Sequence, residues 1–472
     1  MKRSVFFLLL MAVCIGSAAG QRSLKDIEGT WSGILKTIAG DLNLVMHFTM
    51  TEADTIKATL DSPDQGALGI PCGRVTMEGD TLFADMPMIK GEYRGICIGD
   101  SLLRGTWSQL GRSYEMEMKR DAAPVSYERP QEPRPPYPYR EEEVIFHNAV
   151  EDFDLAGTLT LPDGDGPFPA VVLITGSGPE DRDETIFMHK PFLVIADYLT
   201  RNGIAVLRYD DRGVGKSKGR MNDATTMTLA DDAEAAVTYL LQRQEINSDK
   251  IGLAGHSEGG MIAPIVASRN SNIAFIVSLA GPGVRGYDLL LQQARDILAA
   301  MGSSEQEIEE TIATNSHLFK LAVDVQDQRQ FAKDAMAWYG KELEKQGAGS
   351  EERKEKMTAF TQALVSVNNP WMRYFIDTDP SQFWSGVKCP VLALNGEKDL
   401  QVNYEMNLPA IKAAVKKGGN RKVKTVAMAG LNHLFQTADK GSPDEYVKIE
   451  ETFSPAALDL ITGWIKKTMK MK

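Results

Sequence analysis

The chain contains 472 residues, of which 43% are hydrophobic and 25% are charged, and it carries a formal net charge of -12. This composition predicts a globular protein that is long enough for two domains with substantial cores. The acidic balance argues against nucleic acid as a partner, because phosphate backbones bind basic surfaces.

Residues 1–20 have the layout of a secretory signal peptide. Lys2 and Arg3 precede the apolar run 5–15, and small residues follow as far as Gly20. The run is too short to span a bilayer comfortably, so we expect cleavage near Gly20 and export to the periplasm or the medium. Lipid attachment at Cys14 is the alternative, although the three residues before it lack the small residue that usually precedes a lipidated cysteine.

Residues 21–123 consist of short alternating segments separated by Gly, Asp and Pro, which is typical of an all-β domain. The tetrapeptide Gly-Thr-Trp-Ser occurs at 29–32 and again at 105–108, as expected if the first and last strands meet to close a barrel. The Gly-x-Trp at its start resembles that of lipocalin-like barrels. A ligand pocket inside such a barrel is one interpretation, and a packed structural barrel is the one we favour. Cys72 and Cys97 fall in this domain, either paired in an oxidising compartment or as separate thiols.

Six prolines between 124 and 138 predict a semi-rigid linker at 124–140. From 141 onward, strands alternate with helical stretches, which predicts an α/β domain with a mostly parallel sheet and helices on both faces. A helical insertion at about 287–384 separates the sixth and seventh strands and is expected to form a cap. The expected strands lie at 144–149, 154–161, 170–174, 204–207, 251–254, 275–279, 391–394 and 424–428.

The stretch 251–263 joins an apolar run, a Gly-x-Ser-x-Gly core and a small-residue continuation. This pattern is typical of a strand that turns sharply into a helix with Ser257 at the apex. Such a turn strains the serine backbone, and only neighbours without side chains, here Gly255 and Gly259, fit beside it. Ser257 is therefore the candidate nucleophile.

A serine nucleophile in such a fold needs an acid and a base later in the chain. Asp399 follows the strand 391–394, and His433 follows the strand 424–428. Parallel strands bring their carboxyl ends to one edge of the sheet, so the three side chains are predicted to converge. His433 would take the hydroxyl proton, and Asp399 would fix its tautomer and stabilise the imidazolium.

The rivals for these two roles are less well placed. His256 adjoins Ser257, and successive residues at a tight turn point apart. His189 follows the loop after the third strand of the domain and is the serious competitor for the base. Glu397 is the rival acid, although Asp399 lies further into the loop that must turn back toward the histidine.

The loop 175–184 follows the strand that supplies the second oxyanion donor in this kind of site. We predict that the backbone N–H groups of Ser177 and Glu258 form the oxyanion hole, with Gly178 as the alternative to Ser177.

Two glycine-rich stretches suggest other functions. The elbow spacing recurs around Ser217, but charged residues flank that serine and no strand leads into it, so we interpret 215–219 as a solvated loop. Residues 281–286 have the spacing of a dinucleotide-binding turn, yet a long helical stretch follows where another strand is needed. Residues 215–217, Gly-Lys-Ser, resemble the end of a phosphate loop, but Asp210 occupies the position of the first glycine of that motif. Nucleotide binding is therefore not expected.

The motifs at 255–259, 176–184 and 209–217, together with Asp399 and His433, resemble those of the α/β-hydrolase superfamily. Within it, the chain is similar to bacterial carboxylesterases whose neighbours include prolyl-aminopeptidase-like enzymes. The resemblance covers about 141–472 and departs at Thr175, where many esterases have His before the oxyanion glycine.

The sequence therefore predicts an exported serine esterase that forms an acyl-enzyme on a small-molecule ester and requires no metal or organic cofactor. A peptidase with the same triad is the first alternative, with Glu309 or Glu310 as the anchor for a peptide terminus. A non-catalytic protein that binds a glycan or lipid is the second. Aromatic and methionine side chains of the cap could line an acyl pocket or form the core of the cap: Met336, Trp338, Tyr339, Trp371, Met372, Tyr374 and Phe375.

Overall fold

The structure is a computed structural model that describes residues 22–37, 40–52, 55–65, 67–109, 112–121, 127–347 and 349–471. The chain forms two compact units, Met1–Ser126 and Tyr127–Lys472. The segment predicted to be a signal peptide, Cys14 included, lies outside the described residues. Among the residues that are described, no helix has the length and apolar character needed to cross a membrane.

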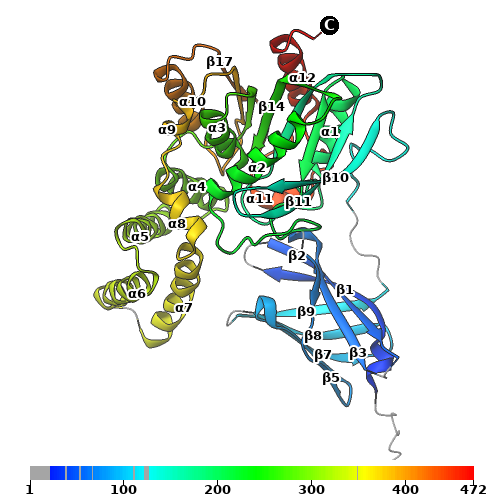
Figure 1. Cartoon of the computed structure of the whole chain (residues 1–472). Helices are drawn as coiled ribbons and strands as arrows, with labels where there is room; N and C mark the ends of the chain where they lie inside the picture. Colours follow the sequence, from blue (N-terminus) through cyan, green and yellow to red (C-terminus); the bar gives the residue numbers. More distant parts are fainter. Residues whose placement is uncertain are drawn as a thin grey trace, which may run out of the picture. The chain divides into compact units, whose positions relative to one another are not determined.

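Unit 1 is a single antiparallel sheet with the strand order β4-β3-β2-β1-β9-β8-β7-β6-β5 (Figure 1). Its inner face buries a core that includes Trp31 and Trp107, each 1% exposed. The strands are β1 (Gly29–Thr37), β2 (Gly40–Met50), β3 (Ile56–Ser62), β4 (Ala67–Pro71), β5 (Val75–Glu78), β6 (Thr81–Met86), β7 (Gly91–Ile98), β8 (Leu102–Gln109) and β9 (Arg112–Arg120). Short 3-10 helices lie at Leu24–Ile27, Pro63–Gln65 and Pro87–Ile89.

The repeated tetrapeptide does not pair across the sheet as the sequence suggested. The first and last strands, β1 and β9, are neighbours, but the second copy lies on β8, with β9 between the two copies. The ends of the strand order are β4 and β5, so the described part is a half-barrel with two edges. Both copies place a tryptophan in the same core, which explains the repeat by packing. Cys72 and Cys97 are free thiols in this structure.

Unit 2 contains an eight-stranded sheet with the order β10-β11-β13-β12-β14-β15-β16-β17. β10 and β11 form an antiparallel hairpin, β11 pairs antiparallel with β13, and the pairs from β13 to β17 are parallel. The strands are β10 (Arg140–Asn148), β11 (Phe153–Leu161), β12 (Phe168–Ile174), β13 (Ala205–Tyr209), β14 (Ile246–His256), β15 (Ile273–Leu279), β16 (Val391–Gly396) and β17 (Val423–Met428).

Helices cover both faces of this sheet (Figure 1). α2 (Thr226–Leu241), α3 (Gly259–Arg269) and α10 (Tyr404–Lys417) pack into the apolar core on one face. α1 (Pro191–Arg201) and α12 (Pro455–Thr468) pack on the other. The strands between the two layers read as continuous apolar runs because they are buried on both sides.

The cap consists of helices inserted between β15 and β16, the sixth and seventh strands. They are α4 (Gly286–Ala300), α5 (Glu305–Asp324), α6 (Gln328–Lys345), α7 (Ser350–Val367), α8 (Pro370–Asp377) and α9 (Ser381–Trp384). α5, α6, α7 and α8 share an apolar cluster of their own. The short helix α11 (Pro443–Tyr446) precedes α12.

The proline-rich segment is tied to unit 2 along much of its length. The guanidinium of Arg129 donates to the backbone carbonyls of Met188, Val447 and Ile449 at 3.1, 2.7 and 3.0 Å. The amide of Gln131 donates to the carbonyl of Phe453 at 2.7 Å. Residues from 127 onward therefore belong to unit 2, whereas the sequence had placed 124–140 in a linker between the domains.

Candidate active site

Ser257 lies at the sharp turn between β14 and α3. Its φ is +50°, a left-handed conformation that is uncommon for residues other than glycine. A Cβ on Gly255 would come within 2.0 Å of the carbonyl oxygen of Gly259, and a Cβ on Gly259 within 2.1 Å of that of Ile174. Both glycines are therefore required by steric contact, and the turn holds the serine at the carboxyl edge of the sheet.

His433 and Asp399 meet at the same edge. Nδ1 of His433 lies 2.8 Å from Oδ2 of Asp399, and the residues are 4% and 3% exposed. The Asp399 carboxylate also accepts the backbone N–H of Gln401 and of Val402, each at 2.8 Å, and the side-chain amide of Asn395 at 3.0 Å. These donors fix the carboxylate, and the carboxylate fixes the ring, as an acid-base pair requires.

The structure places the rival residues elsewhere. Glu397 is exposed. The ring of His189 is fully buried, with contacts to the Tyr446 carbonyl at 2.9 Å and the Thr452 hydroxyl at 3.0 Å. Burial lowers the pKa of His189 to about 4, so this ring is a neutral structural group.

The loop after β12 passes directly beside the nucleophile. A Cβ on Gly176 would lie 3.4 Å from Cβ of Ser257. The N–H of Gly176 is taken by Oε1 of Glu184 at 3.0 Å. Within the described part of the chain, the backbone N–H groups of Ser177 and Glu258 donate to no protein acceptor, which leaves both available for a bound oxyanion.

Comparisons with known proteins find hydrolases among the relatives of this chain. Residues 190–343 match the family model described as serine aminopeptidase, S33. Unit 2 has the α/β-hydrolase fold. This chain is 29% identical over 318 residues to esterase EstD of Thermotoga maritima, and the match covers 66% of each chain.

Two further similarities concern smaller or more distant matches. Acyl-coenzyme A thioesterase 3 of Mus musculus is 27% identical over 164 residues, 34% of each chain. The solved structure of the α/β hydrolase GrgF from Penicillium sp. is 16% identical and covers 70% of this chain and 100% of its own, with a TM-score of 0.43. The matches thus cover slightly under two thirds of the length of the Thermotoga maritima esterase and about a third of the length of the mouse thioesterase.

Buried carboxyl groups lie in the segments around Ser257. Burial raises the pKa of Asp211 to about 8 and that of Glu258 to about 7. Burial, followed by the charges of Glu184 and Asp211, also raises the pKa of Glu180. No local sequence pattern indicates this cluster, because its acids come from three separate segments: Glu180 and Glu184 from the first, Asp211 from the second and Glu258 from the third.

Glu258 connects the elbow to the cap. Its Oε1 accepts the Thr226 hydroxyl at 2.5 Å and the indole N–H of Trp371 at 2.7 Å. The ring of Trp371 stacks on that of Phe375, with centroids 5.5 Å apart, and both belong to an apolar cluster with Met261 of α3. Of the cap side chains predicted to line a pocket, these two lie against the elbow helix.

The other cap side chains divide differently. Met336, Trp338, Tyr339 and Met372 pack into the core of the cap, as the alternative interpretation had it. Tyr374 instead lines a cavity of about 510 Å³ with residues of α5, α6, α8 and α9.

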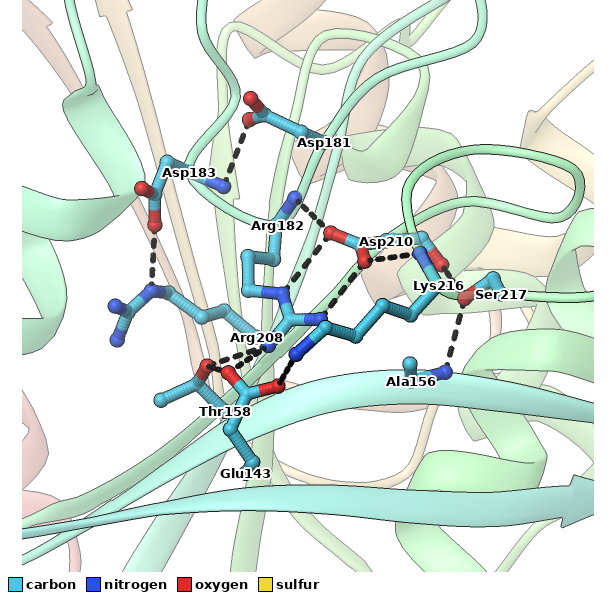
Figure 2. A network of polar contacts seen from close by, with 10 residues as sticks. All are labelled: Glu143, Ala156, Thr158, Asp181, Arg182, Asp183, Arg208, Asp210, Lys216 and Ser217. Carbon is cyan, nitrogen blue, oxygen red and sulfur yellow. Dashed lines mark hydrogen bonds and ion pairs between the residues drawn. The ribbon is translucent and has the colours of Figure 1, made fainter.

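A polar network anchors the loop 175–184, the predicted oxyanion loop, to the sheet (Figure 2). The guanidinium of Arg182 binds Asp210 through two nitrogens, at 2.9 and 2.8 Å. It also reaches Oε1 of Glu143 and the hydroxyl of Thr158, both at 2.7 Å. Arg208 donates to Asp183 at 2.8 Å. The charged residues of the motifs at 176–184 and 209–217 therefore hold the loops that contain them in place.

Ser217 is part of this network and not of a solvated loop. It is 7% exposed, its hydroxyl donates to the carbonyl of Asp210 at 2.6 Å, and it accepts the N–H of Ala156 at 2.9 Å. The flanking lysine that suggested exposure is indeed at the surface, but the serine turns inward to satisfy buried backbone groups.

Proposed function

We propose that this protein is a serine hydrolase that cleaves carboxylic esters through an acyl-enzyme. The single observation that carries the proposal is the buried His433–Asp399 pair, 2.8 Å apart, at the edge of the sheet where the strained elbow presents Ser257. A strained serine beside a fixed base is the arrangement that activates a hydroxyl nucleophile.

In the proposed reaction, His433 removes the proton of Ser257 as the hydroxyl attacks the acyl carbonyl. Asp399 orients the imidazole and stabilises its charged form. The N–H groups of Ser177 and Glu258 hold the tetrahedral oxyanion. His433 then gives the proton to the departing alcohol, and water activated by the same ring releases the acid. No step calls for a metal or an organic cofactor.

An ester substrate is the first choice because the most extensive match among the relatives named above is an esterase. A peptidase is the second candidate, since residues 190–343 match a family described as serine aminopeptidase and buried carboxyls near Ser257 could accept an amine. Glu309, one of the anchors suggested by the sequence, instead pairs with Arg295 at 2.7 Å on the exposed surface of α5. Glu310 is exposed beside it.

We also propose export, on the evidence of the signal-peptide layout at the N-terminus. Amino-terminal sequencing of the protein from a cell fraction tests it: a mature chain that begins near Gly20 supports export, and a chain that retains Lys2 and Arg3 contradicts it.

One panel of substrates tests the function. Chromogenic acyl esters, acetylated sugars and aminoacyl anilides are offered at neutral pH to the full chain and to Ser257→Ala. We expect turnover of esters by the full chain, and loss of turnover in the variant with a nearly unchanged Tm. Turnover of anilides alone would favour the peptidase, and equal turnover by the variant would exclude Ser257.

A further inference from the structure

A second buried histidine and carboxylate lie behind the proposed triad. They are His256 and Glu184, which are 6% and 1% exposed. Nδ1 of His256 is 2.9 Å from Oε1 of Glu184, and its Nε2 is 3.0 Å from the carbonyl oxygen of His433. Both partners are acceptors, so both ring nitrogens donate, and only the imidazolium carries two N–H groups.

The surroundings of the ring favour this charged form. Burial by itself lowers the pKa of His256, but the Glu184 carboxylate, the His433 carbonyl and Asp399 together raise it above its ordinary value. Glu180 is a further titratable neighbour, on the Glu184 side. His256 and Glu184 also line a small pocket whose other lining residues are apolar: Pro191, Phe192, Ile195, Leu279, Leu434 and Phe453.

The same carboxylate oxygen also holds the oxyanion loop. Oε1 of Glu184 accepts the N–H of Gly176 at 3.0 Å, one residue before the predicted oxyanion donor Ser177. Glu184 therefore binds the loop beside the nucleophile and, through His256, the backbone of the base. The rings of His256 and His433 lie with their centroids 4.8 Å apart, so a shift of one ring displaces the other.

We propose that the Glu184–His256 ion pair is the positioning element of this site, which keeps the base His433 and the oxyanion loop in register with Ser257. The inference rests on the proposed roles of Ser257 and His433. Neither member of the pair exchanges a proton with substrate. The pair instead joins three separate chain segments through hydrogen bonds: the loop after β12, the elbow and the loop after β17.

Substitution of the pair separates positioning from simple packing. Asn at 256 cannot donate to both partners at once, so the loop of the base shifts; a misplacement of about 1 Å costs roughly 100-fold in rate. We expect His256→Asn to lower kcat by about 100-fold while KM changes less than about threefold. Glu184→Ala should do the same.

Glu184→Gln is the conservative variant. With its carbonyl oxygen in the place of Oε1, Gln still accepts the N–H of Gly176 and the Nδ1–H of His256, and only the negative charge is removed. We expect it to keep kcat within about tenfold of the unaltered chain. His189→Asn is the matched control for burial, since that histidine is equally buried and lies against the segment 436–452. It should lower Tm without lowering kcat per folded molecule.

The overturning result is a kcat of His256→Asn within about twofold of the unaltered chain, with a loss of Tm like that of His189→Asn. Nitrogen-15 NMR of labelled histidine provides a readout that needs no turnover. At neutral pH both ring nitrogens of His256 should carry protons, and one bare nitrogen contradicts the ion pair. If the unaltered chain cleaves no ester while His256 is doubly protonated, the proposed function fails and the ion pair stands.

Discussion

At the scale of single residues, the choice between Asp399 and Glu397 is the sharpest question about the triad. Asp399 is 3% exposed and hydrogen-bonded to His433, the proposed base, whereas Glu397, two residues earlier, is exposed. Loss of a triad carboxylate lowers turnover by about ten-thousandfold, because the imidazole loses its tautomer and its counter-charge. We predict such a loss for Asp399→Asn with little change in KM, and less than about tenfold for Glu397→Gln.

Steady-state kinetics with a chromogenic ester measures both variants. The opposite ranking would transfer the role to Glu397.

Asp211 predicts how stability changes with pH. Its pKa is raised from 3.8 to about 8, so the folded chain holds this proton more tightly than the unfolded chain does. The stabilising contribution is therefore complete below 3.8 and is lost as the pH rises through about 8. Glu258 contributes with the same sign, since its pKa is also raised.

The free energy of unfolding in urea should fall as the pH rises from 3.8 to about 8, and it should fall less in Asp211→Asn. Ester turnover is not needed for this measurement. A variant that loses stability with pH as steeply as the unaltered chain would show that Asp211 is already ionised when folded.

At the scale of elements, Arg182 determines how firmly the oxyanion loop is attached to the sheet. It makes a bidentate pair with Asp210, whose side chain is 6% exposed, and contacts β10 and β11. Lys offers a single point charge and cannot reproduce this fork. We predict that Arg182→Lys lowers the free energy of unfolding of unit 2 by about 1–3 kcal/mol.

The matched control is Arg353→Lys, at an exposed pair with Glu344 in the cap, where the same change should cost less than about 0.5 kcal/mol because solvent screens such pairs. Urea denaturation measures the free energy of unfolding of both variants. Equal losses of this free energy would mean that the Arg182 network does not anchor the loop.

The elements of unit 2 were predicted more fully than their connections. Apolar runs flanked by turn residues marked the strands, and the glycines around Ser257 marked the elbow, because local backbone sterics leave a local sequence pattern. The Glu184–His256 contact joins residues 72 positions apart and leaves no such pattern. The inward turn of Ser217 was missed for the same reason, since the N–H group that its hydroxyl accepts belongs to Ala156, 61 positions away.

At the scale of the whole molecule, the boundary between the units was predicted less well than the cores. The prolines predicted a linker at 124–140, but the side chains of Arg129 and Gln131 donate hydrogen bonds to backbone carbonyls of unit 2. From the repeat around Trp31 and Trp107 we expected the first and last strands to meet, as β1 and β9 do, but the second copy lies on β8, because a tetrapeptide does not specify which strand lies beside it.

This boundary gives a prediction for shortened chains. A chain of residues 127–472 should fold and hydrolyse small esters, because it keeps the anchoring contacts and the complete core of unit 2. A chain of residues 141–472 loses the hydrogen bonds of Arg129 and Gln131 and should have a lower Tm. Calorimetry compares them, and equal Tm values would show that the segment does not stabilise the unit. A soluble, monodisperse but inactive 127–472 would mean that unit 1 completes the site.

The central claim, that Ser257 is a nucleophile activated by His433, is tested most directly by mapping a covalent adduct. The full chain is treated with a fluorophosphonate, which reacts with activated serines, and its peptides are analysed by mass spectrometry. We predict one adduct per chain, on the peptide that contains Ser257, and none in Ser257→Ala. Labelling of another serine such as Ser217, or undiminished labelling of Ser257→Ala, would contradict the account.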